Sequence, residues 1–128
     1  MQPYRVHTHS ENDGNMHVLC AMMSVNNYGD HSIFVMEKFD PDITPMDEIL
    51  HISRRTPKQI AHMQTTKRNS TILAGYTLQF DMDTQIYHVY TQEGFRDTGI
   101  SEYTQQDCLS AILEQFCMQN GHQIVAVL

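Results

Sequence analysis

The 128-residue sequence contains no apolar run that approaches the roughly 20 residues needed for a membrane-spanning helix. No apolar stretch follows the first residues, Met1-Gln2-Pro3-Tyr4-Arg5, so we expect no secretory signal peptide. Internal repeats, low-complexity tracts and linkers rich in proline, glycine or serine are also missing. We therefore expect residues 1–128 to form one domain with no membrane partner, in which residues 1–15 are a candidate for a mobile N-terminal segment.

Cysteine is scarce, and no Cys-x-x-Cys pair occurs. The three cysteines, Cys20, Cys108 and Cys117, each lie in an apolar stretch, where a free thiol behaves as a small hydrophobic side chain. Their odd number and their spacing fit neither a disulfide framework nor a zinc site. These features predict a reduced, cytoplasmic protein with no nucleophilic cysteine and no cofactor.

Acidic residues are absent from residues 49–80, although the whole chain is acidic, with a formal net charge of −7. This window holds five of the eight basic residues: Arg54, Arg55, Lys58, Lys67 and Arg68. The global charge works against non-specific attraction to nucleic acid. The local excess of positive charge predicts either a solvated basic helix or a patch that binds an anion, nucleic acid or an acidic protein surface.

Apolar periodicity and turn residues divide the chain into strands and helices. The expected strands cover residues 4–9, 16–25, 31–39, 71–80, 85–91 and 122–128, with residues 92–101 as a loop. Thr44-Pro45 and Thr56-Pro57 have the N-cap and first-turn residues of two short helices, ending near residues 53 and 66. Thr104 is the expected N-cap of the longest helix, residues 105–119, which ends at Asn120-Gly121.

This order, β-ββ-αα-ββ-α-β, predicts an α+β fold with a mostly antiparallel sheet of five to six strands, two short helices and one long helix. The long helix could return the last strand parallel to a neighbour, which would make the sheet mixed. The hairpin of residues 16–39 is too apolar to have a solvated face, so we expect it to be central or covered on both sides. The last strand, which is very apolar, is expected inside the sheet.

His7-Thr8-His9-Ser10, followed by Asp13-Gly14, resembles the first metal-binding motif of the polymerase and histidinol phosphatase family. On a strand, His7 and His9 would point the same way and could chelate one metal ion. The resemblance covers about eight residues, and that family's distorted barrel requires roughly 200 residues or more. The motif therefore predicts at most a local metal contact.

A second candidate site is a small-molecule pocket between the sheet and the helices, with Tyr76, His88 and Tyr90 as polar lining. No nucleophile elbow, phosphate-binding loop or dinucleotide fingerprint occurs in the sequence, which favours a non-enzymatic protein. Nine methionines, four of them in the first hairpin, suit an adaptable contact surface. We therefore expect an accessory, inhibitor or immunity-type domain that binds protein and self-associates, plausibly as a homodimer. The alternatives are a nucleic-acid or anion binder and a pocket protein or enzyme.

Overall fold

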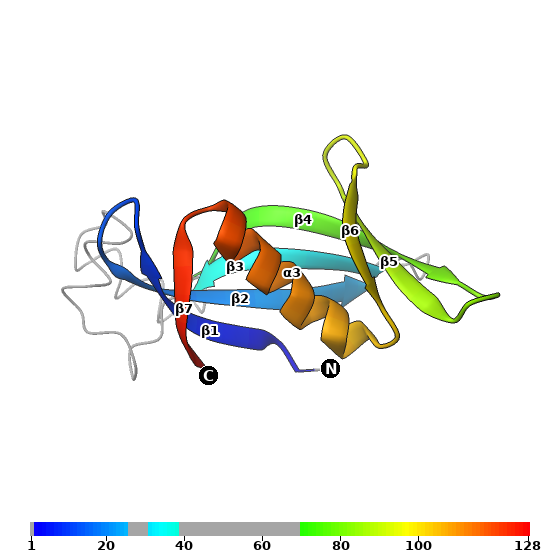
Figure 1. The fold of residues 1–128 in the computed structure, drawn as a ribbon, viewed down its shortest axis with the longest axis horizontal. Helices are drawn as coiled ribbons and strands as arrows, with labels where there is room; N and C mark the ends of the chain where they lie inside the picture. Colours follow the sequence, from blue (N-terminus) through cyan, green and yellow to red (C-terminus); the bar gives the residue numbers. More distant parts are fainter. Residues whose placement is uncertain (1, 26–30, 39–69) are drawn as a thin grey trace.

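The computed structural model describes residues 2–25, 31–38 and 70–128. These residues form a seven-stranded sheet in the order β6-β5-β4-β3-β2-β1-β7, with one described helix, α3 (Figure 1). The elements are β1 Tyr4–Ser10, β2 Met16–Val25, β3 His31–Lys38, β4 Ser70–Asp81, β5 Ile86–Thr91, β6 Asp97–Glu102, α3 Gln105–Gln119 and β7 His122–Val127. Every strand pairing is antiparallel.

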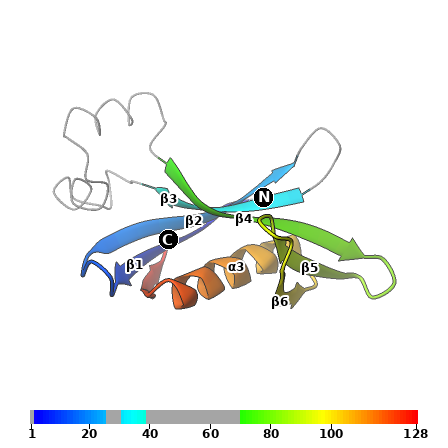
Figure 2. The same cartoon turned by 90° about the horizontal axis from the view of Figure 1, so that it is seen from above.

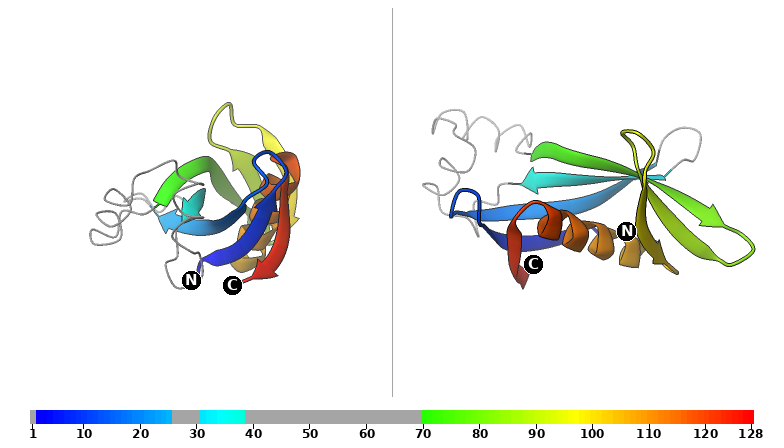
Figure 3. Two further views of the ribbon diagram at one scale, coloured as in Figure 1. Left: turned by 90° about the vertical axis from the view of Figure 1, so that its left-hand side faces the viewer. Right: turned by 45° about the horizontal axis from the view of Figure 1, so that its top comes forward.

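The sheet curls into a half-barrel, and α3 lies across its concave face (Figures 2 and 3). The helix begins where β6 ends and finishes where β7 begins, so it connects the two edge strands across the open side. Its N-cap residue Thr104 accepts a hydrogen bond from the Asp107 backbone N–H at 3.1 Å. Gly121, with φ of 70°, supplies the left-handed conformation that turns the chain into β7.

One apolar stripe of α3 forms the core with the concave face of the sheet. The helix contributes Cys108, Leu109, Ile112, Leu113, Phe116 and Cys117, and the strands contribute Val6, Leu19, Ala21, Ile33, Val35, Tyr76, Leu78, Val89 and Ile100. Strand β2 is also buried on its other face, where Val18 and Cys20 are 2% and 0% exposed. This agrees with the expectation that the first hairpin is central or covered on both sides.

The structure corrects the predicted fold class in several respects. The sheet has seven strands rather than five to six, because the expected loop of residues 92–101 contains β6. All pairings are antiparallel, so the mixed alternative is wrong, and β7 is an edge strand rather than an interior one. The described residues contain one helix instead of three. The two short helices expected before residues 53 and 66 fall outside the described residues.

Candidate functional site

The predicted basic patch is Arg54, Arg55, Lys58, Lys67 and Arg68, and all five residues lie outside the described residues. The described chain therefore gives no geometry for an anion or nucleic-acid site at this segment.

The three predicted pocket residues are not brought together. Tyr76 on β4 is 6% exposed and belongs to the core on the concave face. His88 and Tyr90 on β5 stand opposite Gln79 and Thr77, the β4 positions whose side chains alternate with that of Tyr76. His88 and Tyr90 therefore point from the convex face, and only Tyr76 faces the interior of the half-barrel.

His7 and His9 lie on β1, between β2 and β7, so this part of residues 1–15 belongs to the sheet. His9 is exposed, whereas the Nε2 atom of His7 is buried and has no hydrogen-bond partner among the described residues. Across residues 2–25, 31–38 and 70–128, no three or more His, Cys, Asp or Glu side chains are grouped so that they could hold a metal ion.

The three cysteines are buried, and none of them forms a disulfide. Burial, with a contribution from nearby carboxylates, raises the pKa of the Cys108 and Cys117 thiols to about 11. Both remain protonated at neutral pH, so neither has the thiolate character of a nucleophile.

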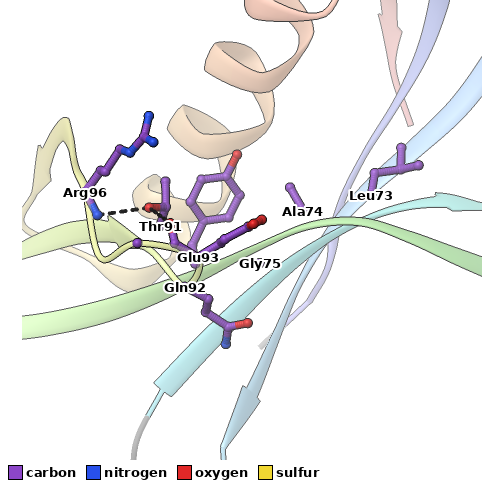
Figure 4. Close-up of a pocket in the computed structure, with 9 residues that line it drawn as sticks. Leu73, Ala74, Gly75, Thr91, Gln92, Glu93 and Arg96 are labelled. Atoms are coloured by element: carbon purple, nitrogen blue, oxygen red, sulfur yellow. Dashed lines mark hydrogen bonds between the residues drawn. The ribbon is translucent and has the colours of Figure 1, made fainter.

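A cavity of about 790 Å³ opens beside Tyr76, between β4 and the loop that joins β5 to β6 (Figure 4). It is lined by Leu73, Ala74, Gly75, Tyr76, Thr91, Gln92, Glu93, Gly94 and Arg96. The Tyr76 hydroxyl makes no hydrogen bond with a described residue, and burial raises the pKa of this side chain. It therefore stays protonated at neutral pH and offers both a donor and an acceptor to the cavity.

The loop wall of this cavity is held by its own hydrogen bonds. The Thr91 Oγ1 hydroxyl donates to the Glu93 carbonyl at 2.8 Å and accepts from the Arg96 backbone N–H at 3.0 Å. Gln92 reaches across Gly75 to donate to Ser32 Oγ at 3.2 Å, and a side chain at Gly75 would overlap it. These hydrogen bonds preorganise the wall of the cavity. Arg96 and Gln92 leave the loop in different directions, so the Arg96 cation lies on one side of the wall (Figure 4).

Strand β7 is the second notable region, because it combines an open edge with apolar exposure. Among residues 2–25, 31–38 and 70–128, its one neighbouring strand is β1. Val125, Val127 and Leu128 are 51%, 61% and 42% exposed. No Asp, Glu, Lys or Arg occurs after Glu114, so no charged side chain of β7 guards this edge.

A histidine cluster lies where β7 begins, and it comprises His17, His122, Asp13, Glu37 and Thr8. The His17 Nδ1 atom is 2.9 Å from Glu37 Oε1, and its Nε2 atom is 2.9 Å from Asp13 Oδ2. Both ring nitrogens face carboxylates, which requires a doubly protonated ring with two donors. Burial opposes the charged ring, but the hydrogen bonds and charges of Glu37 and Asp13 outweigh it and raise the pKa of His17.

His122, the first residue of β7, completes this cluster with the opposite electrostatic tendency. Its Nδ1 atom is 2.9 Å from Thr8 Oγ1, and its ring meets the His17 ring edge-on with centroids 5.1 Å apart. Burial and the neighbouring positive charge of His17 lower the pKa of His122 below its ordinary value. The cluster therefore holds two neighbouring imidazoles whose pKa values are shifted in opposite directions.

Sequence reasoning did not identify this cluster, although one signal was present. His17 occupies the same strand face as Leu19 and Ala21, so its ring had to enter the core side and find partners there. Asp13, four residues earlier, is a local partner. Glu37 and His122 come from distant parts of the chain, and no local pattern places them beside His17.

Comparison with protein-family models, curated proteins and solved structures finds no match for this chain. Within the described residues, no helix has the length and apolar character to cross a membrane.

Proposed function

We propose that this protein is a non-enzymatic protein-binding domain that self-associates by pairing the β7 edges of two copies. The observation that carries the proposal is the uncharged, apolar and unprotected outer side of β7. Backbone N–H and C=O groups along an edge strand pair readily with another strand. Three buried cysteines, none of which forms a disulfide, support the reducing, cytoplasmic location expected from the sequence.

The other edge of the sheet supports this assignment by contrast. Strand β6 carries Asp97 and Glu102, and Gly99 interrupts it with φ of 78°. Register shifts occur at both edges, between His88 and Tyr90 in the pairing of β5 with β6 and between His7 and Thr8 in the pairing of β1 with β7. Charged side chains are a common device against edge pairing, so β6 is the protected edge and β7, which lacks charged side chains, is the edge that we assign to a partner.

A second copy of the chain is the occupant that fits β7 best. Antiparallel pairing about a two-fold axis places the same strand on both sides, so Val125 and Val127 meet identical apolar surfaces. A like-charged contact does not arise there, although each copy carries a net charge of −7, because the strand itself is uncharged. Met118, which is 83% exposed near the end of α3, would extend the apolar contact.

Sedimentation equilibrium over a range of protein concentrations tests the proposal. We expect a dimer for the unaltered protein and a dissociation constant about 100-fold larger for Val127→Lys, since a charge on the edge opposes pairing. The matched control is Met82→Lys, which changes a 79% exposed apolar residue in the β4–β5 turn and should leave the dimer intact. A monomer at every concentration for the unaltered protein would refute self-association.

The cavity beside Tyr76 favours a second candidate function, the binding of a small organic anion. Tyr76 lines this cavity, and its hydroxyl can donate or accept a hydrogen bond. The lining contains the cation Arg96 and the carboxylate Glu93, and we assign the anion to the Arg96 side; the volume of about 790 Å³ suits a small metabolite. Saturation-transfer NMR with benzoate and with benzamide as probes should favour benzoate, and Tyr76→Phe should weaken its signal. Equal signals for the two probes would argue against an anion site.

A further inference from the structure

The start of β7 is fastened to the rest of the molecule by the loop of residues 10–15. The Glu11 backbone N–H donates to the Gly121 carbonyl at 2.8 Å. The Asn12 side-chain amide donates to the Asn120 carbonyl at 2.9 Å. Asp13 of the same loop contacts His17, so the loop joins the turn before β7 to the histidine cluster. Any change in charge within the cluster therefore acts where β7 is attached.

A second positive ring in the cluster is opposed by burial and by the charge of His17. Asp13 and Glu37 attract a proton on His122, but both already bind the two nitrogens of His17, and their attraction is smaller than the opposing effects. Among the described residues, Glu11 and Glu114 are further carboxylates near His122, and they line a shallow cavity with it. Both are exposed, so water screens their charges, and the Cys117 thiol in that cavity is neutral.

We propose that His122 is a pH-sensitive residue: a proton gained there places a second positive ring beside His17 and weakens the attachment of β7 to β1. A protonated His122 can still donate its Nδ1–H to Thr8, so loss of that hydrogen bond is not the cause. The cause is repulsion between two imidazolium rings with centroids 5.1 Å apart, together with the partial burial of the new charge.

The consequence for self-association rests on the proposed function. If two copies pair through β7, acidification loosens the strand that forms their contact, and the dimer dissociates more readily in mild acid than at neutral pH. The response of β7 itself does not require a dimer. The two ideas can therefore fail separately.

Hydrogen exchange of the backbone amides, corrected for intrinsic rates, tests the pH response in the full chain. Between about pH 6.5 and about pH 5, where the stabilising contribution of His17 is already fully present, protection of the β7 amides should fall by up to about tenfold, because the open strand binds a proton that the closed strand resists. Amides in the middle of α3 should keep their protection. Unchanged protection in β7 would overturn the proposal.

Two variants make the test specific. His122→Gln should remove the pH response of β7, whereas the matched control His9→Gln, at an exposed histidine on β1, should keep it. A pH response of His122→Gln equal to that of the unaltered protein would also overturn the proposal. If His122→Gln does not fold, NMR titration of the His17 and His122 rings in the unaltered protein tests the proposal instead. The pKa of His122 should be well below that of His17. The reverse order would refute the proposal, and a monomer at neutral pH would refute only the proposed dimer.

Discussion

The two edge strands of this sheet, β6 and β7, are attached to the rest of the fold by different kinds of contact. Two neutral hydrogen bonds hold β6: the Thr98 hydroxyl donates to the Val89 carbonyl at 2.8 Å, and the Gln115 amide donates to the Thr98 carbonyl at 2.9 Å. An exposed hydrogen bond between His88 Nδ1 and Ser101 Oγ at 3.0 Å adds one titratable contact. Strand β7 is held at its start by the histidine cluster, through the contact between His122 and Thr8. The partly buried contacts of β6 are therefore neutral, whereas those at the start of β7 involve a cluster of titratable groups.

The edges also differ in how they meet solvent. Two acidic residues and an interrupting glycine protect β6, whereas β7 exposes valine side chains without a charge. An edge that is protected and held by neutral contacts suits a permanent boundary of the fold. An edge that is unprotected and held by ionisable contacts suits a surface that is used and regulated. This difference is the physical basis of both proposals.

Helix α3 supports both edges, so weakening it should reduce the difference between them most strongly. Leu109 is fully buried on α3, and Leu109→Ala should lower the free energy of unfolding by about 3 kcal/mol through lost burial and a cavity. Urea denaturation measures this change. Hydrogen exchange should show faster opening of both β6 and β7. A loss of protection confined to one edge would show that the helix does not support them equally.

The fastening of the two edges should differ in its dependence on pH. His17 has a raised pKa in the folded state, so its stabilising contribution is present below its unfolded value of 6.5 and is lost as the pH rises through its folded value. His17→Gln should therefore destabilise the protein by about 2 kcal/mol near pH 6 and by less near pH 9. Urea denaturation at the two pH values measures the difference.

Gln115→Ala is the corresponding change at β6, since it removes the hydrogen bond to the Thr98 carbonyl. Its cost of about 1 kcal/mol should be the same at both pH values, because neither group titrates. An equal pH dependence for His17→Gln and Gln115→Ala would remove the distinction between the edges.

The sequence predicted the elements that depend on local signals. The bounds of α3, residues 105–119, and of β2, residues 16–25, are confirmed, because an N-cap threonine, a glycine stop and a continuous apolar run specify them without distant contacts. Strand β6 was missed because Asp97, Thr98 and Gly99 are typical turn residues, and only pairing with β5 makes them a strand. Asp97 and Gly99 also protect this edge against pairing, so the residues that made β6 hard to predict are the ones that protect it.

The candidate sites depend even more on distant contacts. The edge position of β7 follows from its pairing with β1, at the other end of the sequence, and no local pattern specifies that neighbour. Tyr76 faces the interior of the half-barrel, but the cavity wall comes from the loop of residues 91–96, where Gln92 lies against Gly75. The histidine cluster needs Asp13 from the loop of residues 10–15 and one residue from each of four strands, β1, β2, β3 and β7. Sequence periodicity predicts which face of a strand a side chain lies on, but it does not predict which distant residues that side chain contacts.

Each edge contains or follows one glycine with positive φ, and alanine at these two positions should have unequal effects. Gly99 in β6 has open space around it, so Gly99→Ala should cost about 1 kcal/mol from backbone strain alone. A methyl group at Gly121 would lie 3.3 Å from Asn12 Nδ2 and disturb its bond to Asn120, so Gly121→Ala should cost about 2 kcal/mol. Thermal unfolding of the two variants compares them. A larger effect at Gly99 would show that the loop of residues 10–15 does not fasten β7.

The smallest expected effect comes from removing one charge from the protected edge. Glu102→Val should change the free energy of unfolding by less than about 0.5 kcal/mol, since the residue lies at the end of β6 and no described hydrogen bond depends on its side chain. Asp97 and the irregular backbone at Gly99 still protect the strand, so the mass in solution should remain that of the unaltered protein. If the variant β6 paired with another copy, each molecule would have two pairing edges and would form open-ended oligomers. Sedimentation velocity would then detect species larger than a dimer. Such species would show that the Glu102 carboxylate, rather than the shape of the strand, prevents β6 from pairing with a second copy.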